Sequence, residues 1–502
     1  MSGPCTFGWD YVVAGGGAAG AVVAARLVER TAARVLLLEA GGEADLPAIR
    51  QTGIPGMASL WQDPAVTWPH VTLPQAGLNG RTIPLPQGKV LGGGSSVNAM
   101  LYVRGNRRDY DGWAALGNEG WAYEEVLPCF KRAEDFEDGA GPYHGADGPI
   151  KVARLTRMSE VSRAFLRAAR ELGFPGGEDW DYNGAAQEGA FAYQSTRTKD
   201  DQRSSTAFAY LDPLRGNPRL TVVTGAAVTR VLLDGTTATG VEYVRDGVLH
   251  RAEASAEVIV SCGALATPKL LQLSGIGPAG ALREHGIAVA ADLPGVGAHL
   301  HDHVILGVAY RARMELPLPE LLAEAGMFPP GDPDLQLLFG PVQFVSDEYR
   351  VDGPVFTFAP VLARPRSRGT LALRSADPAD PPLVDPRYLE EPEDLAALVR
   401  GIELCRELAH TEALSPFHDR ESAPGRETGL SSYVRSTATT VWHPVGTCRM
   451  GRDPLAVVDA ALRVHGIDRL RVADASIMPS IPAGNTAAAT VMIGERAADL
   501  LT

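Results

Sequence analysis

The chain has 502 residues, of which 45% are hydrophobic and 21% charged, which is typical of a globular protein and excludes a disordered, fibrous or coiled-coil chain. The 46 Lys and Arg against 60 Asp and Glu give a net charge of −14. Bulk charge therefore does not attract the chain to nucleic acid or to anionic membranes. The length predicts two large domains or three smaller ones.

The cysteines and the N-terminal segment indicate the compartment. Five cysteines without metal or redox spacing are typical of reduced thiols in a cytoplasmic protein. Met1–Asp10 has no positively charged region of the kind that begins a signal peptide. The uncharged run Tyr11–Ala25 is too short and too rich in glycine to span a membrane. We expect a cytoplasmic protein without a membrane span, and nothing in the sequence indicates its oligomeric state.

The first forty residues alternate between strand and helix patterns. Trp9–Ala14 and Arg34–Glu39 are short apolar runs typical of buried strands. Between them, Gly15–Gly20 forms a glycine-rich turn and Ala21–Arg30 has a helical period. A strand, helix and strand in this order predict a parallel sheet.

Gly15, Gly17 and Gly20 have the spacing of a dinucleotide-binding turn. In a chain with 55 glycines accidental spacing is the alternative, but this turn follows a predicted strand and opens a helix. Glycines allow a pyrophosphate to approach the helix N-terminus, and Glu39 at the end of the next strand can accept a ribose hydroxyl. The pattern predicts a dinucleotide cofactor without separating NAD from FAD.

A second glycine-rich segment, Gly88–Asn98, offers successive backbone N–H groups to a ring system or a second phosphate. A flexible linker is the alternative, but the embedded Lys89-Val90-Leu91 and Val97-Asn98 are unlike a linker.

The rest of the chain divides into two kinds of pattern. Buried strands and a helix are predicted at Leu220–Val223, Val228–Leu233, Gly240–Val244, Glu257–Ser261 and Pro268–Leu273. Met327–Asp385 carries short aromatic and β-branched runs between turns, which is typical of an antiparallel sheet, at Leu335–Phe339, Val355–Val361 and Thr370–Leu373. Leu395–His410 is a candidate amphipathic helix. The chain therefore interleaves a parallel nucleotide-binding part with an antiparallel part.

Long motifs resemble, in the same order, those of the glucose–methanol–choline (GMC) oxidoreductases, which are FAD-dependent alcohol oxidases and dehydrogenases. The resemblance covers nearly the whole chain except Val304–Gly353. Its motifs are Gly88–Asp111, Gly263–Gly277, Leu293–Gly297 with Asp302-His303, His443–Gly451, Asp474–Ser476 and Pro482–Thr486.

The resemblance implies a combined α/β and α+β fold. A discontinuous Rossmann-like FAD-binding domain would comprise residues 1–150, 196–303 and 431–502, and a substrate domain built on an antiparallel sheet flanked by helices would comprise residues 151–195 and 304–430. It also implies a set of cofactor-binding residues: Gly15, Gly17, Gly20, Glu39, Gly92, Gly93, Ser96, Asn98, Ala99, Met100, Val228, Asp474, Ala475, Asn485 and Thr486.

Some members of the family bind FAD covalently through a histidine in the glycine-rich segment. Val97 stands at that position, so we expect non-covalent FAD. Ala99 and Met100 would form an apolar floor beside the flavin, and Gln87 stands where arginine is common in the family.

Oxidising an alcohol requires removal of a proton from oxygen and a hydride from carbon. His443 matches the family's catalytic histidine, which implies that it acts as the base while the hydride passes to flavin N5. Asn485 matches the second active-site position, where it would hydrogen-bond the substrate oxygen. The alternatives are a structural His443 and an Asn485 that caps a helix over Thr486–Leu501.

Trp442 and Val441 are expected in the substrate pocket, although core packing is the alternative for Trp442. A tryptophan before the catalytic histidine resembles oxidases of hydroxymethylfurfural and aryl alcohols, and it favours a flat aromatic or furanic primary alcohol. Choline is less favoured, because no acidic residue is assigned to an ammonium cage.

The leading hypothesis is an oxidase that converts such an alcohol to the aldehyde and returns its electrons to oxygen. The alternatives are a dehydrogenase with a quinone, carrier-protein or mycofactocin-type acceptor, a hydroxynitrile lyase with structural FAD, and a non-catalytic flavin-binding protein. His299, His301 and His303 would share one face of a strand, as metal ligands can. The family stretch that they match binds no metal, so we expect none.

Overall fold

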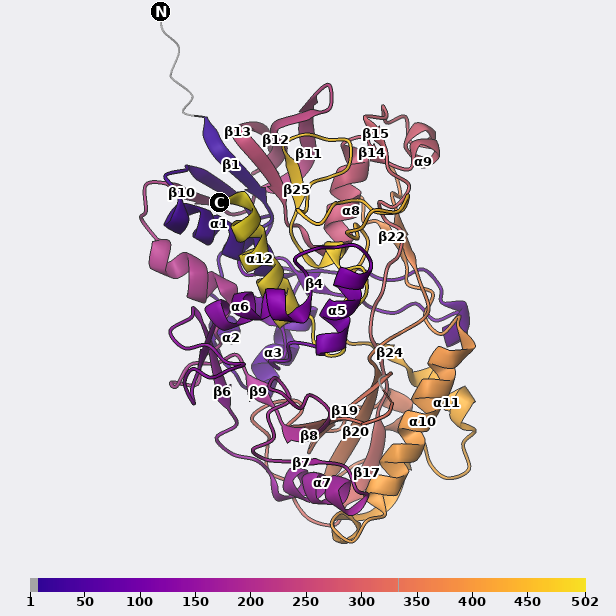
Figure 1. Cartoon of the computed structure of the whole chain (residues 1–502). Helices are drawn as coiled ribbons and strands as arrows, with labels where there is room; N and C mark the ends of the chain where they lie inside the picture. Colours follow the sequence, from indigo (N-terminus) through magenta and orange to yellow (C-terminus); the bar gives the residue numbers. More distant parts are fainter. Residues whose placement is uncertain (1–7, 333) are drawn as a thin grey trace, which may run out of the picture.

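The computed structural model describes residues 8–332 and 334–502. Cys5 and most of Met1–Asp10, on which the expected lack of a signal peptide depends, lie outside these residues. The four described cysteines are unpaired. In residues 8–332 and 334–502, no helix combines the length and the apolar character that crossing a bilayer requires. Figure 1 shows two parts, each built around one sheet, with several short helices between them.

The sheet in the upper part of Figure 1 has seven strands. Its parallel strands lie in the order β10 (Leu220–Val223), β2 (Val35–Leu38), β1 (Trp9–Ala14), β13 (Val248–Val260) and β25 (Leu470–Val472). Every residue of β2 is buried, as expected for a strand covered on both faces. The predicted parallel sheet is confirmed.

The far edge of this sheet is an antiparallel meander that the sequence patterns only partly reveal. The strands β11 (Ala227–Asp234) and β12 (Thr237–Arg245) lead into β13, so the expected strand at Glu257–Ser261 is the end of a much longer one. Asp246 and Gly247 form the two-residue turn between β12 and β13 with φ of +52° and +76°, the geometry that an Asp-Gly pair favours.

The helix α1 (Ala18–Arg30) begins earlier than the sequence predicts, so Gly20 lies inside the helix and not in the turn. A Cβ atom at Gly20 would lie 1.9 Å from the carbonyl oxygen of Gly15. Glycine therefore allows the first turn of α1 to pack directly on the end of β1, where the helix N-terminus faces the glycine turn.

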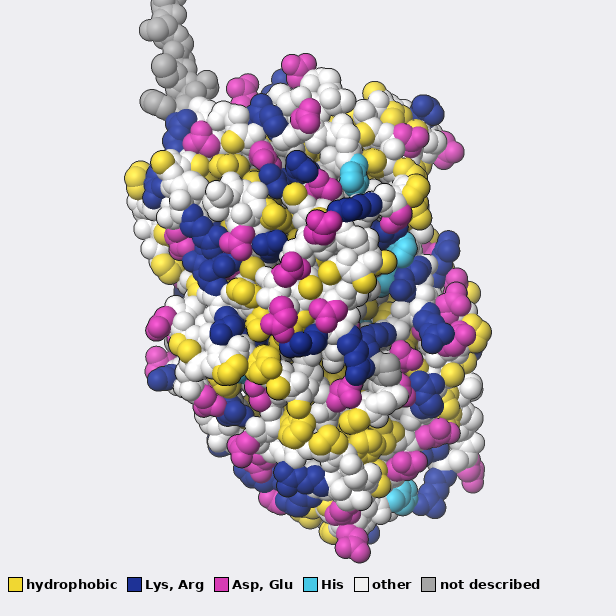
Figure 2. Space-filling model, viewed as in Figure 1, with side chains coloured by type: hydrophobic (Ala, Val, Ile, Leu, Met, Phe, Trp, Pro, Cys, Tyr) yellow, Lys and Arg dark blue, Asp and Glu magenta, His cyan; other side chains and the backbone are white. Residues whose placement is uncertain are grey.

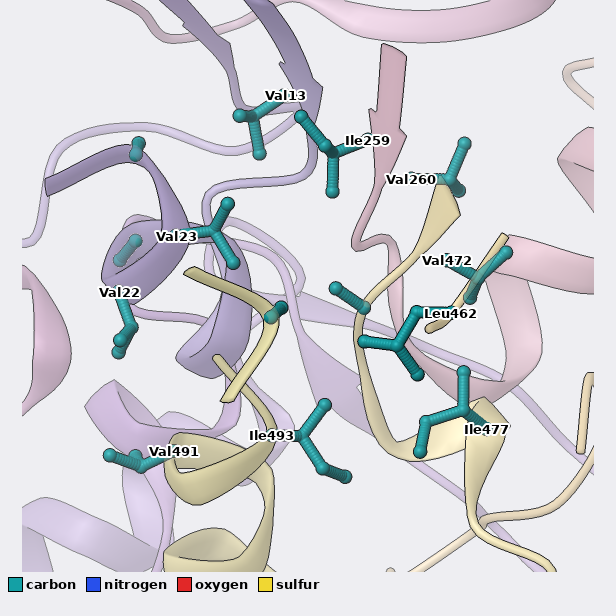
Figure 3. Close-up of a cluster of buried hydrophobic side chains, with 14 of the residues drawn as sticks. Val13, Val22, Val23, Ile259, Val260, Leu462, Val472, Ile477, Val491 and Ile493 are labelled. Carbon is teal, nitrogen blue, oxygen red and sulfur yellow. The ribbon is translucent and has the colours of Figure 1, made fainter. Parts of the chain in front are cut away.

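The core of the upper part lies between this sheet and two helices. The C-terminal helix α12 (Ala487–Leu501) packs along α1, and their valine and isoleucine side chains meet those of the sheet (Figure 3). The labelled residues, all buried, are Val13, Val22, Val23, Ile259, Val260, Leu462, Val472, Ile477, Val491 and Ile493.

The helix α8 (Gly263–Leu273) extends in front of Pro268, where the sequence predicts its start. Proline has no N–H to donate to the carbonyl four residues earlier, which is why it usually begins a helix. Here the hydroxyl of Thr447 donates to the oxygen of Ala264 at 2.6 Å and replaces the missing bond.

The lower part contains the second sheet, in the order β23 (His418–Ala423), β17 (Val308–Ala312), β20 (Val355–Leu362), β19 (Leu335–Gly340), β18 (Ala325–Phe328), β8 (Gly189–Ala192) and β7 (Gly176–Gly177). All neighbouring strands in this order are antiparallel except β7 and β8. Two further strands, β16 (Val304–Ile305) and β24 (Thr439–Thr440), join it beside β20. The expected antiparallel sheet is confirmed, whereas β21 (Thr370–Ala372) pairs only with β22 (Leu383–Asp385).

Helices cover the second sheet, as the sequence predicts. α7 (Glu160–Glu171) and α10 (Pro392–Ala409) pack on it, and α11 (Leu430–Thr437) packs against α10. The predicted fold class is thereby confirmed, while the domain boundaries stay a prediction. The shorter elements are α2 (Pro47–Arg50), α3 (Ile54–Gln62), α4 (Gly94–Val97), α5 (Arg107–Ala115), α6 (Tyr123–Ala133), α9 (Ala279–Glu284), β3 (Thr67–Trp68), β4 (Gln87–Gly88), β5 (Glu134–Phe136), β6 (Ile150–Arg154), β9 (Gln194–Ser195), β14 (Ile276–Gly277) and β15 (Ala291–Asp292).

On the face shown in Figure 2, basic and acidic side chains are interspersed. The described residues form no continuous basic stripe on this face of the kind that follows a phosphate backbone. Patches of apolar side chains lie mainly over the lower part.

Candidate active site

A cavity of about 500 Å³ runs from the glycine turn after β1 to the second sheet. Most of the residues expected to bind the cofactor line it: Gly15, Gly17, Glu39, Gly93, Asn98, Ala99, Met100, Val228, Asp474, Ala475, Asn485 and Thr486. His443, Val441 and Trp442 line it too. The structure thus brings together side chains from both ends of the chain.

Gly20, Gly92 and Ser96 do not line the cavity. Gly92 has a φ of +83°, and a Cβ there would lie 2.3 Å from Oγ of Ser96. The Ser96 hydroxyl is fully buried and donates to the oxygen of Leu91 at 2.6 Å. In this structure these two residues shape the second glycine-rich segment.

The glycines at the cavity wall fit a dinucleotide. Gly15 has a φ of +103°, and a Cβ there would lie 2.4 Å from the oxygen of Ser261. A Cβ at Gly93 would lie 2.7 Å from Cα of Gly17, the N-cap of α1. Two glycine-rich segments thus meet without side chains at a helix N-terminus, which is where a pyrophosphate binds.

Glu39 lies just beyond the end of β2, with its carboxylate at the cavity wall. Its Oε2 accepts a hydrogen bond from the N–H of Gly16 at 2.9 Å, and its Oε1 accepts one from Gly41 at 2.8 Å. Burial raises the pKa of Glu39 to about 7. Each oxygen retains a lone pair for a ribose hydroxyl.

Asn98 is held by Arg203, a buried residue that sequence reasoning missed. Nη1 of Arg203 donates to the backbone oxygen of Asn98 at 2.8 Å and to its side-chain oxygen at 2.7 Å. Burial lowers the pKa of Arg203 to about 9. Its bonds to carbonyl oxygens fix the end of the glycine-rich segment beside the cavity.

The carboxylate of Asp474 accepts hydrogen bonds from several donors of the protein. Its Oδ2 accepts from the N–H of Gly263 at 2.9 Å and from the Thr267 hydroxyl at 2.6 Å, while Oδ1 accepts from Ser476 at 2.8 Å. The carboxylate therefore lies at the N-terminus of α8, where a negative charge is stabilising.

His443 follows β24 in a strained loop and lies at the cavity wall. Nδ2 of Asn485 is 3.4 Å from Nε2 of His443. Thr486, and not Asn485, is the N-cap of α12, and no side chain makes the capping bond. The alternative that Asn485 serves as a helix cap is therefore wrong, because its amide is directed at the histidine.

A second histidine fixes the proton on His443. Nε2 of His303 is 3.0 Å from the oxygen of Ala363, and a carbonyl only accepts, so this nitrogen carries a hydrogen. Burial lowers the pKa of His303 to about 4, so it is neutral at pH 7 and its Nδ1 is an acceptor. Nδ1 of His303 lies 3.0 Å from Nδ1 of His443, which must donate.

His443 is neutral as well, because burial and the nearby His303 hold its pKa well below the usual value. With its one hydrogen on Nδ1, His443 keeps a lone pair on Nε2, the atom beside Asn485. The arrangement presents a base and an amide donor side by side at the cavity wall.

His299 and His301, the other two histidines of the segment that contains His303, lie apart from the pair formed by His303 and His443. Nδ1 of His299 is 3.3 Å from Nε2 of His301, and their rings stack, whereas His303 turns to His443. Residues 8–332 and 334–502 contain no group of three or more His, Cys, Asp or Glu placed to hold a metal ion.

The end of the cavity beside His443 is mostly apolar. Trp61 of α3 and Trp442 meet edge to face with ring centroids 4.8 Å apart, and Nε1 of Trp61 donates to the oxygen of Val97 at 2.7 Å. Sequence reasoning missed Trp61, since no local pattern pairs it with Trp442. The other apolar lining residues here include Ile305, Leu322, Leu338 and Phe344.

A glycine turn that suits a dinucleotide and a neutral histidine beside an amide, at the wall of one cavity, are what a cofactor-dependent oxidoreductase requires. Models of the GMC oxidoreductase family match residues 9–305 and 365–494. The chain belongs to this family, so the resemblance, an enzyme that acts on CH–OH donors and FAD as its cofactor are confirmed.

Similar proteins act on several alcohols. The chain is 39% identical to an alcohol dehydrogenase (acceptor) of Pseudomonas putida, over 98% of this chain and 95% of that one. It is 40% identical to the mitochondrial choline dehydrogenase of Mus musculus, over 98% and 89%. The crystal structure of pyridoxine 4-oxidase from Mesorbium loti superposes with a TM-score of 0.93 at 33% identity, over 98% of each chain.

Proposed function

We propose that this protein oxidises an apolar aromatic or furanic primary alcohol to the aldehyde, with His443 as the base. The observation that carries the proposal is the neutral His443 whose Nε2 lone pair lies at the cavity wall, 3.4 Å from the amide of Asn485. Nε2 takes the hydroxyl proton, and the Asn485 amide donates to the alcohol oxygen. FAD, when bound, would supply the acceptor for the hydride that leaves the alcohol carbon.

The lining of the cavity supports an uncharged aromatic substrate. The Trp61–Trp442 pair provides flat apolar surface close to the base. Among the described residues that line the cavity, the acids are Glu39 and Asp474, and both accept hydrogen bonds from backbone N–H groups. We infer that both carboxylates serve the glycine turn and the N-terminus of α8, so we expect choline to be a poorer substrate than an aromatic alcohol, despite the 40% identity to a choline dehydrogenase.

The mode of FAD attachment is also part of the proposal. Val97 lines the cavity in the second glycine-rich segment and carries no nucleophile. The histidines that line the cavity, among the described residues, are His70 and His443, and neither belongs to that segment. We propose that FAD is bound without a covalent bond.

Oxygen is the proposed electron acceptor, which the likeness to pyridoxine 4-oxidase supports. The likeness to an alcohol dehydrogenase (acceptor) favours a second candidate, a dehydrogenase that passes electrons to a quinone, a carrier protein or a mycofactocin-type acceptor. The two differ only in how the reduced cofactor is reoxidised.

The test is the absorption of the bound flavin when alcohols are added without oxygen and air is then admitted. We expect benzyl and furfuryl alcohols to bleach it, choline to leave it unchanged, and air to restore it rapidly. Slow recovery in air would favour the dehydrogenase. Bleaching by choline but not by aromatic alcohols would contradict the proposed substrate, and cyanide release from mandelonitrile without bleaching would favour the lyase.

A further inference from the structure

The residue before the base has an unusual backbone conformation. Trp442 has a φ of +62°, the left-handed region that a bulky side chain rarely adopts. Strain of this kind persists only where surrounding contacts impose it, and it concentrates at functional sites. Because Trp442 directly precedes His443, this turn decides where the catalytic imidazole is aimed.

The contacts that impose the turn converge on Asp302, which is 3% exposed. Its Oδ1 accepts from the N–H of His443 at 2.8 Å. Its Oδ2 accepts from the Thr440 hydroxyl at 2.5 Å and from the Tyr388 hydroxyl. Oγ1 of Thr440 in turn accepts from the N–H of Trp442 at 2.7 Å. Two successive backbone N–H groups are thus held by Asp302, one directly and one through Thr440.

We propose that Asp302 is a positioning residue, which holds the left-handed turn at Trp442 and thereby places the ring of His443 against His303 and Asn485. This proposal rests on the proposed function only for its kinetic consequence, because the geometry is a property of the protein alone.

Asp302 does not act as the carboxylate of a Ser-His-Asp triad. Such a carboxylate accepts from the imidazole ring and stabilises its charge, whereas Asp302 contacts the backbone of His443, and the ring Nδ1 is already bonded to His303. Within the described residues, Asp302 forms no ion pair with Lys or Arg, so its bonds to hydroxyl and N–H donors are what stabilise its buried charge.

A substitution that removes the charge but keeps the shape tests this role. In Asp302→Asn one oxygen becomes an amide nitrogen, which cannot accept from the donors that Asp302 serves. We expect a crystal structure of the variant to show Trp442 outside the left-handed region and the Nδ1 atoms of His443 and His303 separated beyond hydrogen-bonding distance. The rate of flavin reduction by benzyl alcohol should fall by about 10-fold to 100-fold, the cost of a small misplacement of a reacting group.

Asp394→Asn is the matched control. Asp394 is also buried, and it accepts from the backbone N–H groups of Arg366 and Ser367 and from the Ser367 hydroxyl, but it does not line the cavity. Its substitution should lower the melting temperature similarly and leave the reduction rate per bound FAD unchanged. Equal rate losses in the two variants would overturn the proposal.

The structural readout separates this proposal from the proposed function. If Asp302→Asn retains a positive φ at Trp442 and the contact between His443 and His303, the proposal is wrong, whatever the substrate. If the turn relaxes although no alcohol reduces the wild-type flavin, the proposed function fails and the positioning role stands. Should Asp302→Asn not fold, Thr440→Val is the second variant. It removes both the acceptor for the N–H of Trp442 and the hydroxyl that donates to Asp302, so we expect the same turn to relax, and a retained turn would overturn the proposal.

Discussion

Nδ1 of His303 lies 3.0 Å from Nδ1 of His443, and the carbonyl of Ala363 on the far side of His303 decides which of the two donates. The pair therefore holds His443 in the tautomer whose free lone pair is on Nε2. Two groups in series fix the imidazole of His443: the carbonyl of Ala363 sets the tautomer of His303, and His303 sets that of His443.

Replacing His303 tests this arrangement. His303→Phe keeps a ring in place but removes the acceptor, so Nδ1 of His443 loses its partner and either tautomer becomes accessible. We expect flavin reduction to slow by between about 10-fold and 10⁴-fold, the range spanned by loss of an orienting partner. Stopped-flow absorbance measures this rate.

His303→Asn is the matched control, because its side-chain oxygen can take the place of Nδ1 and accept from His443. It should retain most of the rate. Equal losses in the Asn and Phe variants would show that the ring, and not its acceptor, matters.

The low pKa of His443 predicts an unusual pH profile. A base must be unprotonated, and burial lowers its pKa, so His443 stays neutral as the pH falls until the pH drops through its folded-state pKa. We therefore expect the rate of flavin reduction in FAD-saturated protein to fall only well below pH ~6.5, the ordinary pKa of histidine. A pH–rate profile whose acidic decline is centred at or above that pH would contradict a buried, neutral base.

Glu39 is predicted to control the affinity for FAD. In Glu39→Gln an amide N–H replaces one of the oxygens that accept from Gly16 and Gly41, so the glycine turn loses a bond. Leaving one buried donor unpaired costs about 1–3 kcal/mol, or about 5-fold to 150-fold in affinity. Titration of the apoprotein with FAD, followed by flavin fluorescence, measures the loss.

The same residue predicts a pH dependence of FAD binding. Because burial raises the pKa of Glu39 to about 7 in the protein without ligand, the carboxylate is lost as the pH falls through that value. Wild-type affinity should therefore weaken between pH 8 and 6, whereas Glu39→Gln should show a flat profile. An equal decline in both proteins would show that a group other than Glu39 causes the pH dependence of FAD binding.

Non-covalent attachment of FAD predicts a simple result. After acid precipitation, the yellow colour should appear wholly in the supernatant, because Val97 provides no atom that can bond to the flavin. Colour in the pellet would contradict the expectation and direct attention to His70, the other histidine at the cavity wall.

Local patterns explain which parts of the fold can be predicted from sequence. The βαβ unit depends on contiguous residues, so the strand at Trp9–Ala14, the glycine turn and Glu39 are recognisable together. The early start of α8 cannot be recognised from local sequence, because the residue that compensates for Pro268 is Thr447, far along the chain. Likewise only the end of β13 is recognisable as a strand, because its full length depends on its pairing with β1 and β12.

Some residues of the candidate site are likewise recognisable from the sequence, whereas the roles of others depend on the folded chain. His443 and Asn485 lie in motifs that the family resemblance identifies, and the structure brings them to 3.4 Å. The role of His303 depends on a contact across 140 residues and on a carbonyl that any residue supplies. Trp61 meets Trp442 only in the folded chain, so no spacing in the sequence indicates the pair.

The most direct test of the account compares wild type with His443→Ala in one experiment, the rate at which benzyl alcohol bleaches the bound flavin without oxygen. Loss of a general base should slow bleaching by about 10²-fold to 10⁴-fold while FAD content stays the same. Rapid bleaching of wild type and this loss in the variant would establish His443 as the base. Equal rates in the two proteins would contradict the central claim.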